Sequence, residues 1–276
     1  MKSIFDNFND LTQRVITAAL GAIVIIIAIL WSEWAYFAVF LGICIFTQLE
    51  FYKLLKLDEM LPLKFWGTMA GVIIYIIVFM EQKYEMSSKY YFLLLPVIYM
   101  AFLIKLYKKT EKKPFTNIGL TFLGIIYVAL PFALLHVSAY HTGPYTYQII
   151  VGIIFIQWAS DTGAYFAGIR FGKRKLFERV SPKKSWEGFL GGMMLAILMS
   201  VGMSKYFGTL ELWEWLSIAL IVAVVGTYGD LVESLFKRSM EIKDSGSYIP
   251  GHGGFLDRFD SLLLSLPFIA AFLKIF

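Results

Sequence analysis

Long apolar runs alternate with short polar segments along the whole chain of 276 residues. A helix needs about 20 mainly apolar residues to cross a bilayer, and a tilted or capped helix can use somewhat fewer in its apolar part. The pattern predicts nine membrane-spanning helices, with boundaries loose by several residues, at 15–31, 34–49, 65–80, 90–104, 118–136, 147–167, 187–205, 213–229 and 261–276. Only Ser32 and Glu33 separate the first two, which implies a tight helical hairpin. We therefore predict an all-α, polytopic integral membrane protein.

Composition agrees with this class and excludes an ordinary soluble domain. The chain is 58 % hydrophobic and 16 % charged, with a mean hydropathy of +0.68. No small-residue cleavage site follows the first apolar run, so we expect no cleavable signal peptide. The single cysteine, Cys44, excludes an intrachain disulfide. We expect one membrane domain over 1–276, with 1–136 as a helical scaffold part and 147–276 carrying the site.

The distribution of positive charge predicts the orientation. If the connecting segments alternate between the two sides, 21 of the 25 lysines and arginines fall on the side of the N-terminus. The positive-inside rule places that side in the cytoplasm. We therefore expect a protein of the cytoplasmic membrane with its N-terminus inside. Three charged segments share that side: 105–117, which is lysine-rich and serves mainly to orient the chain, 168–186 and 230–260.

The densest chemistry lies in the segment from Gly229 to Asp260, which holds six of the 20 acidic residues. Such a block of charge beside a membrane helix is costly unless a polyanion or a metal binds there. Asp230, Ser234 and Lys237 would share one helix face with the adjacent Arg238. Magnesium takes one or two carboxylates plus phosphate oxygens, which suits this face. The alternative is a solvated helix end held by an intrahelical Glu233–Lys237 pair.

A glycine-rich loop follows this helix and precedes the last span. Its glycines free the backbone to close N–H groups on a phosphate; they are Gly246, Gly251, Gly253 and Gly254. Asp257, Arg258 and Asp260 come next. Asp230 and Asp257 would stand at one membrane boundary on adjacent helices, so we predict that they form a metal clamp. His252 in the loop could be a general base, a phosphate hydrogen-bond partner or a structural residue.

A second cationic region runs from Ser160 to Gly192. Asp161 lies near the end of an apolar run, where an unpaired carboxylate is expensive. Gly163, Gly168 and Gly172 are expected to interrupt or end that helix. The segment 181–185 suits a helix start that attracts anions, although positive charge that only sets topology is the alternative. Gln48 and Glu50, at the end of the second span, are interpreted as interfacial residues, with a substrate-facing role as the alternative.

Together these motifs resemble the signature of the phosphatidate cytidylyltransferase (CDP-diacylglycerol synthase) family. The matching residues in the long motif are Ser234, Phe236, Lys237, Arg238, Lys243, Asp244, Gly246, Ile249, Pro250, His252, Gly253, Gly254, Asp257, Arg258, Phe259 and Asp260. The upstream stretches 161–165 and 181–188 are similar to the family as well. The motifs cover parts of the C-terminal 120 or so residues, and the N-terminal half matches only as a set of spans.

The resemblance implies transfer of CMP from CTP to phosphatidate, with release of pyrophosphate. It implies Mg²⁺ as cofactor and a monovalent cation such as K⁺ as an assisting ion. The expected partners are CTP, phosphatidate and membrane lipids, with no nucleic acid, and the enzyme could be a homodimer. Metal ligands would be Asp230 and Asp257, followed by Asp161 and Asp260.

The remaining expected site residues fall into two groups. The catalytic group contains Asp230 and Asp257 again, with Lys237, Arg238, Arg258 and His252. The substrate-binding group contains Asp161, Lys183, Lys184, Ser185, Glu187, Ser234, Lys243, Asp244, Gly253 and Gly254. Two alternatives stay open: a related lipid-directed CTP enzyme (a CDP-archaeol synthase or a CTP-dependent polyprenol kinase), and an anion transporter, which would show charge near mid-membrane and useful residues on both sides.

Overall fold

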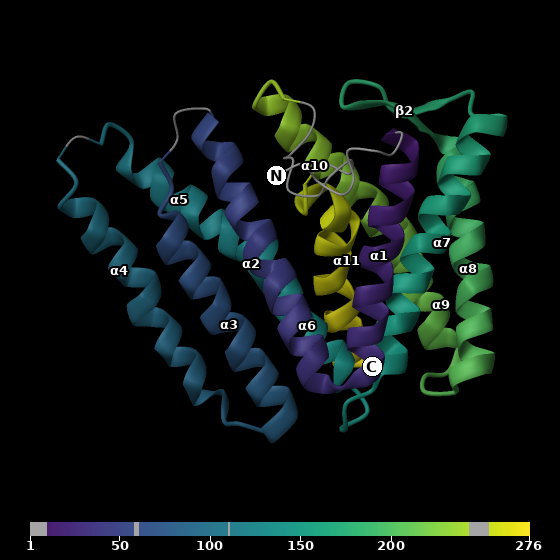
Figure 1. Cartoon of the computed structure of the whole chain (residues 1–276), viewed down its shortest axis with the longest axis horizontal. Helices are drawn as coiled ribbons and strands as arrows, with labels where there is room; N and C mark the ends of the chain where they lie inside the picture. The colour runs from purple at the N-terminus through teal and green to yellow at the C-terminus, as the bar shows by residue number, and fades with distance from the viewer. Residues whose placement is uncertain (1–9, 58–60, 110, 243–253) are drawn as a thin grey trace.

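The computed structural model describes residues 10–57, 61–109, 111–242 and 254–276, and these residues are mostly helical. The helices run back and forth between two ends of the molecule (Figure 1). The first half contains α1 (Asp10–Trp31), α2 (Glu33–Leu57), α3 (Lys64–Tyr84), the 3₁₀ segment η2 (Ser88–Leu93), α4 (Leu94–Leu106), α5 (Pro114–Gly124), the π-helical turn η3 (Ile125–Ala129) and α6 (Leu130–Ala139).

The second half adds four long helical segments and one small β-hairpin. Its elements are α7 (Tyr147–Phe171), β1 (Lys175–Phe177), β2 (Ser181–Ser185), α8 (Trp186–Phe207), α9 (Leu212–Ile221), the π-helical turn η4 (Val222–Gly226), α10 (Thr227–Ser239) and α11 (Leu256–Ile275). The chain stays helical from α5 through η3 to α6, and again from α9 through η4 to α10. The antiparallel β-hairpin was not predicted.

Each of the nine predicted stretches lies almost wholly within one helical segment, which confirms the all-α polytopic class. By length and composition, seven segments of the described chain could cross a membrane: Glu33–Leu55, Lys64–Tyr84, Ser88–Leu106, Pro114–Ala139, Tyr147–Phe171, Trp186–Phe207 and Leu212–Ser239. Ile16–Trp31 is apolar but shorter. The tight hairpin between α1 and α2 is confirmed, because only Ser32 separates them and its Oγ accepts the Ala35 N–H at 3.1 Å.

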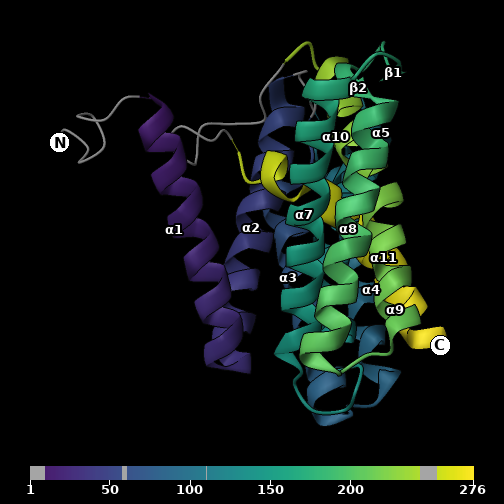
Figure 2. The same cartoon turned by 90° about the vertical axis from the view of Figure 1, so that its right-hand side faces the viewer.

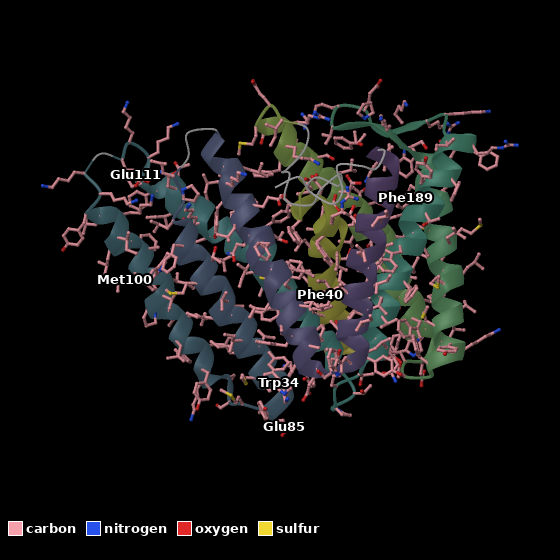
Figure 3. The ribbon with its side chains drawn as sticks, in the orientation of Figure 1. Trp34, Phe40, Glu85, Met100, Glu111 and Phe189 are labelled. Atoms are coloured by element: carbon pink, nitrogen blue, oxygen red, sulfur yellow. The ribbon has the colours of Figure 1, made fainter. Side chains whose placement is uncertain are left out.

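The charged segments gather at one end of the molecule, which we call the β-hairpin end. The α2–α3 link, the α4–α5 link, the hairpin and the end of α10 all lie there (Figure 1). Figure 3 shows Glu111 at this end and Trp34 and Glu85 at the opposite end. The alternation of connecting segments predicted from the apolar pattern is therefore present in the fold, whereas the assignment of this end to the cytoplasm remains a prediction.

Small residues bring α7 and α8 into close contact (Figure 2). A Cβ added to Gly191 would lie 2.2 Å from the Ala167 Cβ, and one added to Gly163 would lie 2.5 Å from the Gly191 carbonyl oxygen. Close backbone approach through such residues is a common way to join helices in membranes. The expected interruption of α7 at Gly163 and Gly168 is wrong, because α7 runs on to Phe171; only Gly172 follows its end.

Buried polar side chains join the helices of the first half. The Gln48 amide nitrogen donates to the Gly67 carbonyl at 3.0 Å and to the Tyr52 hydroxyl at 3.2 Å. Tyr52 in turn donates to the Thr121 carbonyl at 2.7 Å. This chain of hydrogen bonds links α2, α3 and α5. Gln48 is fully buried within the bundle, where these hydrogen bonds satisfy its amide nitrogen.

Candidate active site

The site is built where α10 crosses α11. A Cβ added to Gly229 would lie 2.7 Å from the Asp260 carbonyl oxygen and 3.0 Å from the Ser261 Cα, so only glycine allows this approach. The crossing brings Asp230, the next residue on α10, close to the first turns of α11. The predicted helical face is confirmed at its start, because the Ser234 hydroxyl donates to Asp230 Oδ1 at 3.2 Å.

Three carboxylates and one lysine form what we call the aspartate cluster: Asp161, Asp230, Asp260 and Lys184. Lys184 Nζ lies 2.7 Å from Asp230 Oδ2. Asp161, on α7, accepts a hydrogen bond from the Gln157 side chain at 3.1 Å. Asp260 precedes the stretch predicted to cross the membrane. Burial, and then the negative charge of Asp230, raise the pKa of the Asp260 carboxyl. Asp161 adds to this effect, and Lys184 opposes it.

A second group, the lysine bridge, joins α10 to α11. Lys237 Nζ lies 2.7 Å from Glu233 Oε2 and 2.9 Å from Asp257 Oδ1. The Gly254 N–H donates to Asp257 Oδ2 at 3.2 Å. Burial opposes ionisation of Asp257, but hydrogen bonds to Glu233 and Lys237 outweigh it and lower the pKa to about 2. The intrahelical Glu233–Lys237 pair considered as an alternative is therefore present, and it is joined by a carboxylate from a second helix.

The two groups give Asp230 and Asp257 different partners. Asp230 contacts Lys184 and Ser234, whereas Asp257 contacts Lys237 and Gly254. Within the described ranges, no three Asp, Glu, His or Cys side chains are gathered as a ready-made metal cage. Magnesium does not need one, because it commonly takes one or two carboxylates and completes its shell with water and substrate phosphate. Three carboxylates facing one lysine leave the aspartate cluster with the excess negative charge that suits a divalent cation.

The β-hairpin presents Lys184 to this site. Ser185 ends β2 and caps α8, its Oγ accepting the Gly188 N–H at 3.2 Å, so the predicted helix start is confirmed. Lys183, which directly precedes Lys184 in β2, is exposed. Glu187 accepts the backbone N–H groups of Lys173 at 3.0 Å and Arg174 at 3.2 Å. Glu187 thereby holds the segment that leaves α7.

The other predicted residues either surround these two groups or lie in the part of the chain that the structure does not describe. Arg238 on α10 and Arg258 on α11 are exposed at the β-hairpin end. Gly254 lies two residues before α11 and is buried. Four of the predicted site residues lie outside the described residues: Lys243, Asp244, His252 and Gly253. The predicted glycine-rich loop lies outside them as well, except for Gly254.

Two further residues lie near the site. Glu50, interpreted from the sequence as interfacial with a substrate-facing role as the alternative, is fully buried and hydrogen-bonded to the start of α11. Tyr127, in the π-helical turn η3, lies within electrostatic reach of Asp260, Glu233 and Asp230. Its hydroxyl is buried and finds no hydrogen-bond partner among the described residues. Tyr127 was not identified from the sequence, because nothing in the pattern distinguishes it from the other tyrosines.

Comparison with known proteins covers nearly the whole chain. The sequence model described as the Cytidylyltransferase family matches residues 12–276. The phosphatidate cytidylyltransferase of Haemophilus influenzae is 33 % identical over 95 % of this chain and 98 % of its own. That of Bacillus subtilis is 30 % identical over 97 % and 99 %, and that of Staphylococcus aureus strain COL is 37 % identical over 63 % and 66 %.

The family model and the first two of these relatives extend through α7, α8, α10 and α11, which carry the aspartate cluster and the lysine bridge. They also extend through the first half of the chain, which the sequence motifs alone did not reach. The chain therefore belongs to the Cytidylyltransferase family.

Proposed function

We propose that this protein is a membrane-bound phosphatidate cytidylyltransferase, which makes CDP-diacylglycerol and pyrophosphate from CTP and phosphatidate. The observation that carries the proposal is the convergence of four aspartates and two lysines from α7, β2, α10 and α11 at one end of an apolar bundle. The phosphatidate cytidylyltransferases of Haemophilus influenzae and Bacillus subtilis match almost the full chain. We further propose that the β-hairpin end faces the cytoplasm, that nine helices cross the membrane, and that the N-terminus is inside.

In the proposed reaction, a phosphatidate oxygen forms a bond to the α-phosphorus of CTP. The bond from that phosphorus to the bridging oxygen of the β-phosphate breaks, and pyrophosphate leaves with the electron pair. The nucleophile and the leaving group are both anionic, so neutralising charge and holding the groups in line should supply most of the rate enhancement. A lipid phosphate is already ionised near neutral pH, and the reaction therefore needs no general base.

The described residues suit three roles in this reaction. Asp230, with one of its neighbours Asp161 and Asp260, would hold Mg²⁺ together with phosphate oxygens, and Asp257 is the fourth candidate ligand. When bound, the ion would neutralise charge on the triphosphate. Lys184 would fix the orientation of Asp230. The exposed side chains of Lys183, Arg238 and Arg258 would bind phosphate groups of the nucleotide or the lipid.

The deciding experiment uses purified full-length protein, phosphatidate and CTP labelled at either the α- or the γ-phosphorus. We expect the α-label to enter the lipid only when Mg²⁺ is present, with K⁺ tested as an added variable. Transfer of the γ-label alone would identify a lipid kinase. Failure of both labels to reach the lipid, in protein shown to be folded, would overturn the proposed function.

A further inference from the structure

The end of α2 contacts the start of α11, although the two are 205 residues apart in sequence. Glu50 on α2 is 0 % exposed. Its Oε2 accepts the Phe255 N–H at 2.9 Å, and its Oε1 accepts the Leu256 N–H at 3.4 Å. A carboxylate taken out of water is costly unless its oxygens are hydrogen-bonded. Both oxygens of Glu50 are used on the same short segment of backbone.

These contacts supply what α11 lacks in its own sequence. The first N–H groups of a helix have no partner within the helix, and a short polar side chain at the N-cap usually accepts one of them. The N-cap residue of α11 is Phe255, which makes no side-chain cap. Glu50 accepts N–H groups at this position instead, and its negative charge also suits the positive end of the helix dipole. The start of α11 is therefore fixed by another helix.

Aromatic contacts extend the same link to α10. The rings of Phe46 and Phe255 stack with centroids 5.4 Å apart. The rings of Phe51 and Phe236 stack at 5.0 Å, and Phe236 directly precedes Lys237. Residues 46–51 of α2 thus contact the residue next to Lys237 and the residue two before Asp257. These are the two side chains whose bond closes the lysine bridge.

We propose that Glu50, supported by Phe46 and Phe51, is a positioning residue that sets the place of Asp257 relative to Lys237. This inference deepens the proposed function and rests on it for its kinetic part. A displacement of about 1 Å in a reacting group can lower a rate by up to about a hundredfold. Loosening the start of α11 should therefore lower kcat strongly while the protein stays folded. The first half of the chain would then take part in building the site, beyond acting as a scaffold.

The test compares Glu50→Gln with Glu33→Gln in the full-length protein. Glu33 is a matched control, because it also lies on α2, pairs with Lys83, and accepts the Tyr140 hydroxyl at 2.9 Å, but it lies near the other end of the helix. We expect Glu50→Gln to lower kcat about tenfold or more, and Glu33→Gln to leave kcat nearly unchanged. Glu50→Asp, whose side chain is one methylene shorter, should lower kcat as well and serves if the glutamine variant does not fold.

Hydrogen exchange gives a second readout that does not depend on activity. The amides of Phe255 and Leu256 should exchange faster in the Glu50 variants and at the original rate in Glu33→Gln. Unchanged exchange at these amides, unchanged kcat in both Glu50 variants, or an equal loss of kcat in Glu33→Gln would overturn the inference. A wild-type protein that makes no CDP-lipid would instead overturn the proposed function. The exchange measurement would still test whether Glu50 holds the Phe255 and Leu256 amides.

Discussion

Lys237 contacts carboxylates from two helices at once. Glu233, one turn earlier on α10, is 1 % exposed, and Asp257 on α11 is 13 % exposed. Breaking a buried pair by removing one partner leaves an uncompensated charge, which typically destabilises by about 3–5 kcal/mol. If either acid is neutralised here, Lys237 still has the other acid as its partner. The arrangement therefore tolerates a change at Asp257 better than an isolated pair would.

The first prediction concerns Asp257. Asp257→Asn keeps the size of the side chain and an oxygen to accept the Gly254 N–H, while Lys237 keeps Glu233 as a partner. We expect the variant to fold and insert, and to lose about a hundredfold or more in kcat, because it lacks a charge at the proposed site. Label transfer from α-labelled CTP measures the activity, and size-exclusion elution measures folding.

Glu85→Gln is the control for this substitution, since Glu85 is exposed at the end opposite to the β-hairpin. It should retain full activity. A folded Asp257→Asn protein with near-normal turnover would remove Asp257 from the site.

At the scale of elements, glycines decide which helices can cross closely. Gly229 in α10 lies against the backbone of α11, and backbone atoms cannot yield to an added methyl group as a flexible side chain can. By contrast, a Cβ added to Gly202 on α8 would meet nothing within 4 Å. Two glycines in helices can therefore have opposite importance, although sequence position alone does not distinguish them.

The second prediction uses this pair. Gly229→Ala should push α10 and α11 apart at Asp260, destabilise the fold by about 1–3 kcal/mol as overpacking does, and lower kcat at least tenfold. Gly202→Ala should keep full activity and the same or a slightly higher melting temperature, since alanine is the better helix former. Thermal unfolding and label transfer on both variants measure the two effects. Equal behaviour of the two variants would contradict the role of the crossing.

At the scale of the whole molecule, the fold separates two ends with different charge. The β-hairpin end carries the aspartate cluster, the lysine bridge and the exposed arginines Arg238 and Arg258. Figure 1 places the α2–α3 and α4–α5 links at the same end. Concentration of the site at one end disfavours the transporter alternative, which needs useful polar residues along a path between both sides.

The third prediction assigns these ends to the two sides of the membrane. In a Cys44→Ala background, a single cysteine at Lys89→Cys should react with a membrane-impermeant thiol reagent in intact cells. A cysteine at Lys109→Cys, which lies beyond α4 at the β-hairpin end, should react only after the membrane is opened. The parent Cys44 is buried and should react slowly in both conditions. The opposite labelling pattern would invert the proposed orientation.

The sequence alone determined the helical segments and the end at which they gather their charge, and it predicted most residues of the candidate site. This was possible because membrane helices need long apolar runs, and because an unpaired acid beside such a run is costly. The hairpin at Ser32, the cap at Ser185 and the face of Asp230 and Ser234 are all local features, and all were confirmed.

Only the tertiary structure decided how the acids are shared among partners. It placed Asp230 with Lys184 and Asp257 with Lys237, and it used Glu50 from a distant helix to cap α11. It also showed that Gly163 and Gly168 permit close packing and leave α7 unbroken. Periodicity defines the faces of a helix but carries no information on the distance or rotation of its neighbours. These depend on contacts between residues far apart in the chain, such as the contact of Glu50 with Phe255.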